Sequence, residues 1–220
     1  MRSYLWYIAT IILSLTLLSS CSKDEEYVYP DLYNEFVDFT TNGEGTVYMM
    51  TTDAGENWNL PTIKGLTGLK PDSIYRVVAK FVPGSSENDN MATLYSSQGT
   101  LSPVPVSASR FTVVKTDPVK IQSIWRGGEY VNIVLNVLVK DKSHKFNFIQ
   151  NSLSDTGEGG KKRLSITLYH DNNDDVLAFY RTVYLSVPLW AYKERLNKGD
   201  EVEININTYD KGVVKTILNY

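Results

Sequence analysis

The sequence predicts an all-β protein in which a small barrel is followed by a larger antiparallel β-sandwich. Short runs of β-branched and aromatic residues recur at hairpin spacing, and turn residues separate them. No long segment with helical periodicity follows the first twenty residues. The chain also holds 15 tyrosines among 220 residues, and tyrosine is favoured in half-buried strands. Together these observations favour sheets over helices.

Short strands fill the first half of the predicted fold. Asn42-Gly43 predicts a hairpin, because both residue types accept a positive φ. A polar loop follows Pro83-Gly84, and prolines after it suggest an irregular segment. A small barrel would need about five such strands, and the candidates are residues 35–41, 46–52, 74–82, 91–96 and 110–115.

Longer strands are predicted beyond Thr116-Asp117-Pro118, where we place a domain boundary. Apolar residues alternate along 131–139, with Val131, Ile133 and Leu135 on one face. The same alternation recurs along 164–168 and 202–206, and 177–187 is a longer aromatic-rich strand. Hairpin-spaced strands of this kind are typical of an antiparallel sandwich. One turn of helix is predicted over 192–197, and Trp125 is predicted to lie in the sandwich core.

The N-terminus has the pattern of a secretory signal. Arg2 precedes an apolar run that ends in Leu18-Ser19-Ser20-Cys21. The run is shorter than the roughly 20 residues that a membrane-spanning helix needs, although a single anchor is the alternative. The pattern resembles the lipobox of bacterial lipoproteins. The resemblance implies a signal peptide over 1–20 and acyl chains, such as palmitate, attached at Cys21.

Acidic residues follow this cysteine directly. Residues 21–34 are predicted to be a tether, broken by Pro30. Its start resembles the export signal of surface lipoproteins in Bacteroidota, which implies a lipid-anchored protein of the outer membrane exposed at the cell surface. The alternative is a solvated tether on a protein that faces the periplasm. The residues of the predicted export signal are Ser22, Lys23, Asp24, Glu25 and Glu26.

The second half of the chain resembles the NigD-like lipoproteins. The similar residues are Asp117-Pro118-Val119, the stretch 123–132 (SIWRGGEYVN), 168–171 (LYHD) and 184–189 (YLSVPL). This resemblance implies an N-terminal OB-like barrel over 35–117 and a C-terminal β-sandwich over 118–220. The family is named after a bacteriocin locus, where a member was proposed to be an immunity protein. It offers no catalytic residue set to carry over.

Composition argues against several classes of protein. The chain carries 22 Lys and Arg against 25 Asp and Glu, a net charge of −3. Nucleic acid is therefore not an expected partner, because phosphate binding needs a basic face. Cys21 is the only cysteine, so a disulfide within the chain is excluded.

Catalytic patterns are not found in the sequence. The chain has two histidines, His144 and His170, and no nucleophile-elbow, zinc or P-loop motif. We expect no enzyme, no cofactor and no metal, although a pair of carboxylates could serve a glycosidase. The loop from Asp171 to Asp175 is rich in oxygen ligands that calcium prefers. A tight turn is the favoured interpretation of this loop, and calcium binding is left open.

Exposed aromatic residues near strand ends are the candidate binding residues: Trp58, Trp190 and Tyr192. The sequence thus predicts a non-catalytic lipoprotein of the cell envelope that acts as a binding module, with a role in immunity or envelope assembly. The alternative is a glycan-binding accessory protein of a surface polysaccharide-uptake system. A glycan binder should gather several aromatics on one face, whereas a protein binder should show a mixed apolar patch with a polar rim.

Overall fold

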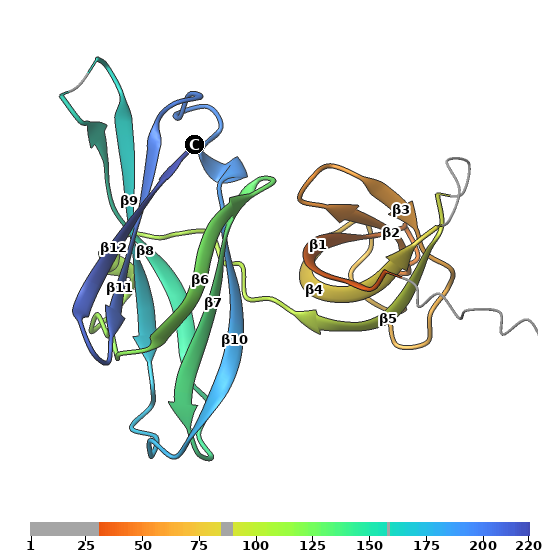
Figure 1. Ribbon diagram of the computed structural model, residues 1–220, viewed down its shortest axis with the longest axis horizontal. Coiled ribbons are helices and arrows are strands. Elements are labelled where there is room, and N and C mark those ends of the chain that lie inside the picture. Colours follow the sequence, from red (N-terminus) through yellow and green to blue (C-terminus); the bar gives the residue numbers. More distant parts are fainter. Residues whose placement is uncertain (1–30, 85–89, 158) are drawn as a thin grey trace, which may run out of the picture. The chain divides into compact units, whose positions relative to one another are not determined.

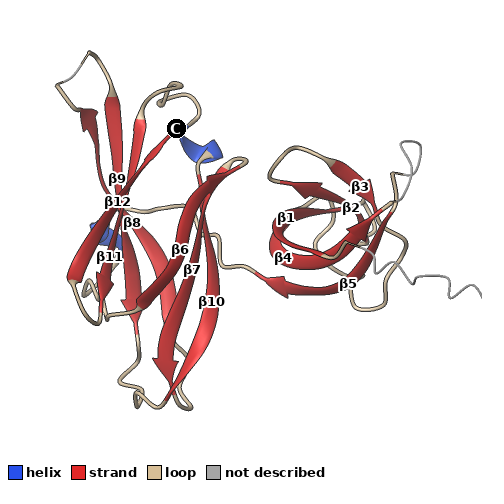
Figure 2. Ribbon diagram, in the orientation of Figure 1, coloured by secondary structure: helices blue, strands red, loops and turns tan. Residues whose placement is uncertain are grey.

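The structure, a computed structural model, describes residues 31–84, 90–157 and 159–220. Throughout these ranges the chain consists of strands, loops and two short 3-10 helices, so the all-β prediction is confirmed (Figures 1 and 2). The predicted signal peptide and most of the tether, including Cys21 and the acidic residues after it, lie outside the described residues.

The N-terminal part is a five-stranded sheet in which hydrogen-bonded neighbours are antiparallel, in the order β3-β2-β1-β4-β5. One bridge, between Asn59 and Met91, joins its two outermost strands. This closure rests on a single bridge, so the OB-like assignment stays a prediction. The strands are β1 (Tyr33–Thr41), β2 (Val47–Thr52), β3 (Asn57–Asn59), β4 (Ile74–Pro83) and β5 (Ala92–Gly99).

The first hairpin joins β1 and β2 as predicted, but its turn is built differently. The Asn42 side chain accepts hydrogen bonds from the backbone N–H groups of Glu44 and Thr46, at 3.0 and 2.9 Å. The left-handed conformation falls on Gly45 (φ 74°), where a side chain would collide with the Leu69 carbonyl. The asparagine therefore acts through its side chain, in the manner of an Asx turn.

The C-terminal part consists of two sheets. The first has the order β10-β7-β6 and the second β12-β11-β9-β8. All neighbours are antiparallel except β9 and β11, which are parallel, in contrast to the fully antiparallel prediction. The strands are β6 (Lys120–Gly127), β7 (Tyr130–Val139), β8 (Lys145–Asp155), β9 (Lys162–Asp171), β10 (Phe179–Pro188), β11 (Glu201–Thr208) and β12 (Gly212–Asn219).

The sandwich core follows the predicted alternation. Val131, Ile133 and Leu135 of β7 are completely buried, as are Leu164 and Ile166 of β9. Because side chains alternate between the faces of a strand, every second residue of each strand reaches the space between the sheets. The predicted β-sandwich is confirmed, and its apolar core is continuous from β7 across to β11.

The linker between the two parts joins the sandwich earlier than predicted. The Thr100 N–H donates to the carbonyl of Arg76 in β4, whereas the next N–H, that of Leu101, donates to Tyr184 in β10. Further on, Val106 forms a bridge with Ile149. Backbone pairing therefore changes partner well before the boundary predicted at Asp117-Pro118. The strand predicted over 110–115 does not form.

Two further predictions need correction. Trp125 does not lie in the sandwich core: it is 38% exposed on the outer side of β6, and its ring packs edge-on against Phe36 of β1. The predicted turn of helix begins earlier, as the 3-10 helix η3 (Trp190–Tyr192). The other 3-10 helix, η2 (Ala108–Arg110), lies in the linker.

Candidate functional site

The three predicted binding aromatics have different surroundings. Trp190 is 47% exposed at the start of η3 and is available to a partner. Trp58 is half-buried against the N-terminal core. Tyr192 is 1% exposed, and its hydroxyl donates to Gln150 Oε1 at 3.1 Å. Tyr192 is thus a core residue and offers no ring to a partner, contrary to the prediction.

A buried polar cluster joins the N-terminal sheet to the sandwich. Arg76 of β4 donates through Nη1 to Asp38 at 3.2 Å, and through Nη2 to Asp53 at 2.6 Å and to Asn132 at 2.9 Å. Its Nε donates to the Ser186 hydroxyl at 3.3 Å. Four different side chains therefore hold one guanidinium. We call these five residues the Arg76 cluster.

Strand register explains how this cluster forms. Asp38 lies directly opposite Arg76 in the β1–β4 pair. In the same way, Asn132 lies opposite Ser186 in the β7–β10 pair. Residues directly opposite in an antiparallel pair carry their side chains on the same face. Each sheet thus presents one polar pair, and the two pairs meet at the junction, where Asp53 from the loop after β2 bridges them.

Aromatic rings and two glycines enclose the cluster. The Arg76 guanidinium lies 4.0 Å from the centre of the Tyr130 ring and 5.5 Å from that of Phe36. A flat cation over aromatic faces is stabilised by the ring quadrupoles. A side chain at Gly127 would collide with Asp53 and Asn132, so glycine allows this close approach. The β6–β7 turn therefore lies directly against Asp53 and Asn132.

Burial sets the ionisation of the cluster. Removal from water raises the pKa of Asp38, and the neighbouring Arg76 cation opposes this effect. Burial likewise raises the pKa of Tyr130, with a further contribution from the charge of Asp38. Near neutral pH, Tyr130 is thus an uncharged phenol beside the Arg76 cation.

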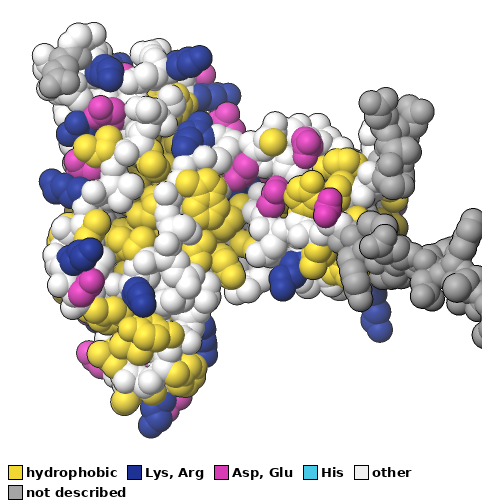
Figure 3. Space-filling model, viewed as in Figure 1, with side chains coloured by type: hydrophobic (Ala, Val, Ile, Leu, Met, Phe, Trp, Pro, Cys, Tyr) yellow, Lys and Arg dark blue, Asp and Glu magenta, His cyan; other side chains and the backbone are white. Residues whose placement is uncertain are grey.

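Two grooves flank this cluster. The first, the Trp190 groove, has a volume of about 440 Å³ and is lined by Asp38, Ile74, Arg76, Ser102, Glu129, Tyr130 and Trp190. The second, the Trp125 groove, has a volume of about 340 Å³ and is lined by Asn34, Glu35, Phe36, Asp53, Val78, Trp125, Val134 and Tyr184. Figure 3 shows apolar and acidic side chains together over this part of the surface.

The Trp190 groove combines apolar surface with negative charge. Trp190 and Ile74 are exposed by 47% and 65%. Glu129 supplies an exposed carboxylate, whereas the Asp38 carboxylate is paired with the Arg76 cation, whose side chain is only 3% exposed. The groove can therefore accept an apolar group with a nearby positive charge.

A histidine pair lies in another part of the sandwich. His144 Nδ1 is 2.9 Å from His170 Nε2, and His170 Nδ1 is 2.8 Å from the Asp117 carbonyl. Burial lowers the pKa of His170, and His144 adds to this effect. Because a carbonyl can only accept, the Nδ1 of a neutral His170 carries the proton and its Nε2 accepts from His144. His144 Nε2 in turn lies 3.4 Å from Asp175 Oδ2, a contact that becomes an ion pair only when His144 is protonated.

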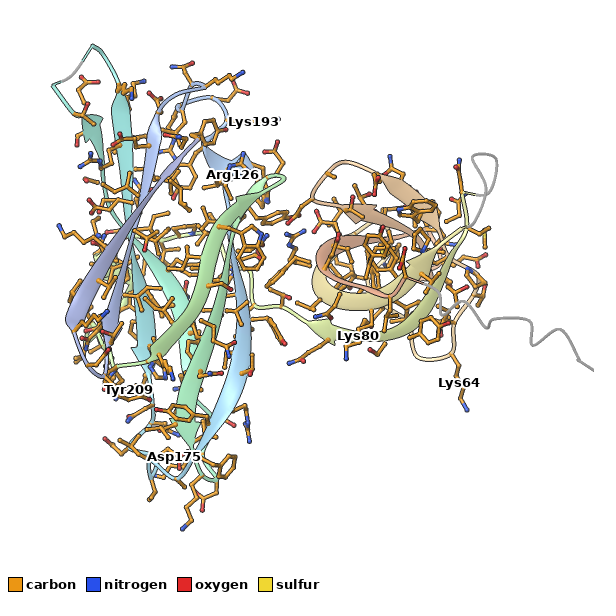
Figure 4. All side chains as sticks on the ribbon, in the orientation of Figure 1. Lys64, Lys80, Arg126, Asp175, Lys193 and Tyr209 are labelled. Carbon is orange, nitrogen blue, oxygen red and sulfur yellow. The ribbon has the colours of Figure 1, made fainter. Side chains whose placement is uncertain are left out.

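The acidic loop is a hydrogen-bonded turn. Asp175, labelled in Figure 4, accepts backbone N–H groups from Lys140 at 2.7 Å and from Val176 at 2.9 Å. Asp171 pairs with Lys115 at 2.8 Å. These carboxylates hold the protein's own donors, as the turn interpretation expects. Within residues 31–84, 90–157 and 159–220, no three His, Cys, Asp or Glu side chains are gathered in a way that could hold a metal ion.

Sequence reasoning missed the Arg76 cluster and Glu129. Arg76, Asn132 and Ser186 each occupy an outward strand position, where a polar residue is ordinary. Their burial results from contact between the two parts of the chain. Local periodicity does not carry that information, so no signal in the sequence could have found them.

A family model described as the NigD-like C-terminal beta sandwich domain matches residues 102–220. The chain belongs to the NigD-like family. The match begins beside Leu101, where the backbone first pairs with the sandwich. No curated protein was found to be similar to this NigD-like chain.

Solved structures resemble this NigD-like chain over most of its length. A NigD-like immunity protein from Bacteroides caccae is 27% identical with a TM-score of 0.70, over 86% of this chain and 93% of that one. Two others share the fold. One from Parabacteroides distasonis, proposed to be toxin-related, is 18% identical (TM-score 0.66, 86% and 93% covered). One from Bacteroides fragilis, proposed to be a lipoprotein, is 12% identical (TM-score 0.61, 87% and 98% covered).

In the part of the chain that the structure describes, no helix is long and apolar enough to cross a membrane.

Proposed function

We propose that this chain is a non-catalytic, lipid-anchored binding protein of the bacterial outer membrane with an immunity- or envelope-related role. The observation that carries the proposal is the similarity to the Bacteroides caccae immunity protein, which extends over both parts of the chain. In this proposal the chain acts by binding another molecule rather than by transforming a substrate. Such a role needs a shaped surface and no catalytic group.

The Trp190 groove is the proposed contact with a protein partner. Protein interfaces gain most of their binding energy from a few aromatic anchors surrounded by a polar rim. Trp190 and Ile74 supply apolar surface, and Glu129 supplies an exposed carboxylate at the rim. The groove therefore favours a partner that inserts an apolar side chain next to a lysine or arginine.

Glycan binding has less support. A sugar-binding face needs several exposed aromatics in one place. The Trp125 groove is lined by three aromatic residues, but Phe36 is buried and Tyr184 half-buried, so Trp125 is its one exposed ring. The other candidates, Trp58 and Tyr192, are half-buried and buried. A glycan-binding accessory role therefore stays the second choice.

Lipid attachment at Cys21 is proposed from the sequence, from family membership and from a fold relative proposed to be a lipoprotein. Each buried methylene contributes about 0.8 kcal/mol, so several acyl chains hold a protein at a membrane. Cys21→Ala should move the protein out of the membrane fraction or leave an uncleaved precursor. Normal lipid labelling of this variant would exclude the anchor.

Surface display is a separate proposal that rests on residues 22–26. Replacing Lys23, Asp24, Glu25 and Glu26 by alanine should keep the anchor and hide the protein from protease added to intact cells. Unchanged cleavage from outside would rule out this export signal.

The binding function is tested with residues 22–220, which contain the whole compact unit 32–220. Partners captured from envelope and culture extracts are identified, and the same protein is applied to a glycan array. Trp190→Ala should weaken capture of the protein partner by about 1–3 kcal/mol, or about 5- to 150-fold. Tyr95→Ala is the matched control, because Tyr95 is 61% exposed and lines neither groove.

Two results would contradict this function. Capture that Trp190→Ala and Glu129→Lys leave unchanged would exclude the Trp190 groove. Reproducible turnover of an envelope polymer that one carboxylate or histidine substitution abolishes would refute the non-catalytic role.

A further inference from the structure

Strand β10 is the outermost strand of its sheet, and only part of its free side is covered. The Leu101 N–H donates to the Tyr184 carbonyl at 3.2 Å, and the Ser186 N–H donates to the Leu101 carbonyl at 3.0 Å. The linker therefore already adds one residue of backbone pairing to this edge. This pairing does not extend to the residue before Leu101, because the N–H of that residue, Thr100, donates to Arg76 in the N-terminal sheet.

The uncovered part of this edge, Phe179–Val183, continues the same line of hydrogen-bonding groups. The N–H and C=O of one residue point to the same side of a strand, and successive residues alternate. Since Tyr184 and Ser186 point away from β7, Tyr180 and Thr182 do so too. Within residues 31–84, 90–157 and 159–220, no backbone partner faces these two residues from outside the sheet. We call Phe179–Val183 the free edge.

Apolar surface lies on both faces of the free edge. Phe179 and Tyr180 are exposed by 51% and 54%, and Lys120 lies over the Tyr180 ring. On the inner face a pocket of about 160 Å³ opens beside the strand. Its lining is Val137, Val139, Lys142, Ser143, His144, Phe146, Arg181 and Val183. An added strand would place every second side chain at this pocket, which is how β-strand addition acquires specificity.

The charge of the free edge indicates the chemistry of its occupant. Arg181 is exposed beside the pocket and forms no ion pair among the described residues. Lys142, on the pocket rim, donates through Nζ to the carbonyls of Asn173 and Asp174, which carry no charge of their own. A carboxylate opposite Arg181 would stabilise the pairing of a strand that adds here.

Two registers in which a second copy of the chain could pair with the free edge are unfavourable. Two copies of β10 could pair Tyr180 with Thr182 reciprocally, which would place Arg181 opposite its own symmetry mate. Like charges directly opposite are destabilising. A register centred on Thr182 would set Tyr180 against Tyr184, whose carbonyl Leu101 already occupies.

We propose that the free edge binds an extended segment of a partner protein as an additional strand, with apolar inward side chains and a carboxylate opposite Arg181. Backbone bonds from Tyr180 and Thr182 hold the segment, and the inner pocket receives its alternate side chains. This site is separate from the Trp190 groove, so it can be present or absent whether or not that groove binds a partner.

The probes are short blocked peptides in which valine alternates with threonine, carrying glutamate or lysine at one central valine position. They are titrated into residues 22–220, and amide hydrogen exchange is followed by NMR. The glutamate peptide should slow exchange of the Tyr180 and Thr182 amides and bind about fivefold or more tightly than the lysine peptide. Arg181→Glu should reverse this preference.

Thr182→Pro removes the outward N–H, and proline is tolerated on the open side of an edge strand. It should abolish peptide binding while keeping the thermal midpoint of Thr182→Val. Thr182→Val is the matched control: it loses the same hydroxyl bond to Asn136 but keeps the N–H. Trp190→Ala should bind the peptides normally, which separates this test from that of the groove.

Three results would overturn the proposal. Binding that survives Thr182→Pro, or peptides that leave both amides unprotected, would exclude strand addition. Protection that rises with protein concentration alone would identify a second copy as the occupant. An unchanged glutamate preference in Arg181→Glu would exclude the carboxylate partner of Arg181.

Discussion

The N-terminal sheet and the sandwich differ most in how much apolar surface each encloses. In the described part of the chain, the sandwich core gathers 18 buried apolar residues and the N-terminal core gathers nine. Stability in a small domain rises with the apolar area that it buries. The sandwich is therefore the more self-sufficient part, and we expect the smaller sheet to depend on contacts beyond its own core.

The Arg76 cluster is the contact that meets this need. It places a cation from the N-terminal sheet against Asn132 and Ser186 of the sandwich. A buried cation without its partners is strongly destabilising, whereas one held by several acceptors fixes a single arrangement. The N-terminal sheet has the smaller core and is held to the sandwich by the polar contacts of the Arg76 cluster. Both grooves form where these contacts bring the two parts together.

Matched core substitutions should separate the two parts most clearly. Phe148 in the sandwich and Phe39 in the N-terminal sheet are both 1% exposed. Each change to alanine should cost about 3–5 kcal/mol. Phe148→Ala should lower the single unfolding transition of the whole chain, because the N-terminal sheet cannot remain folded without the sandwich. Phe39→Ala should instead give two transitions in circular dichroism. Two unfolding transitions in Phe148→Ala would mean that the N-terminal sheet can remain folded without the sandwich.

A methyl group at the junction should have a smaller effect. Gly127→Ala places a carbon against the side chains of Asp53 and Asn132, and overpacking of this kind costs about 1–3 kcal/mol. Gly43→Ala is the control, because nothing lies within 4 Å of that position. Denaturant unfolding measures both variants. Equal stabilities would mean that the junction is loosely packed.

The fold was more predictable than the site because its signal is local. Alternation along 131–139 predicts which face lies in the apolar core, whatever the rest of the chain does. Trp125 shows where this reasoning fails, since its position on β6 faces the N-terminal sheet and not the space between the sandwich sheets. For Tyr192 the error is the opposite one: an exposed ring was predicted, but a residue near a sheet end can still point into the core. Contacts between distant segments decide both cases.

The histidine pair should make the sandwich sensitive to mild acid. Burial lowers the pKa of His170, so the unfolded chain binds a proton more readily than the folded one. Stability is then complete above the ordinary histidine pKa of about 6.5 and falls as the pH drops below it. His170→Asn keeps a donor for the Asp117 carbonyl without titrating. Its thermal midpoint should fall less between about pH 7 and about pH 5 than that of the unaltered chain. Equal losses would exclude His170 as the group responsible.

The tie between the two parts is tested most directly by hydrogen exchange in Arg76→Met, with Lys80→Met, at an exposed position further along the same strand, as control. The account predicts faster exchange of the β1, β2 and β4 amides in Arg76→Met, with β7, β9 and β11 as protected as in the unaltered chain. Lys80→Met should change neither group of strands. Unaltered exchange in β1, β2 and β4, or an equal increase in β7, β9 and β11, would contradict the claim that Arg76 ties the weaker sheet to an independently stable sandwich.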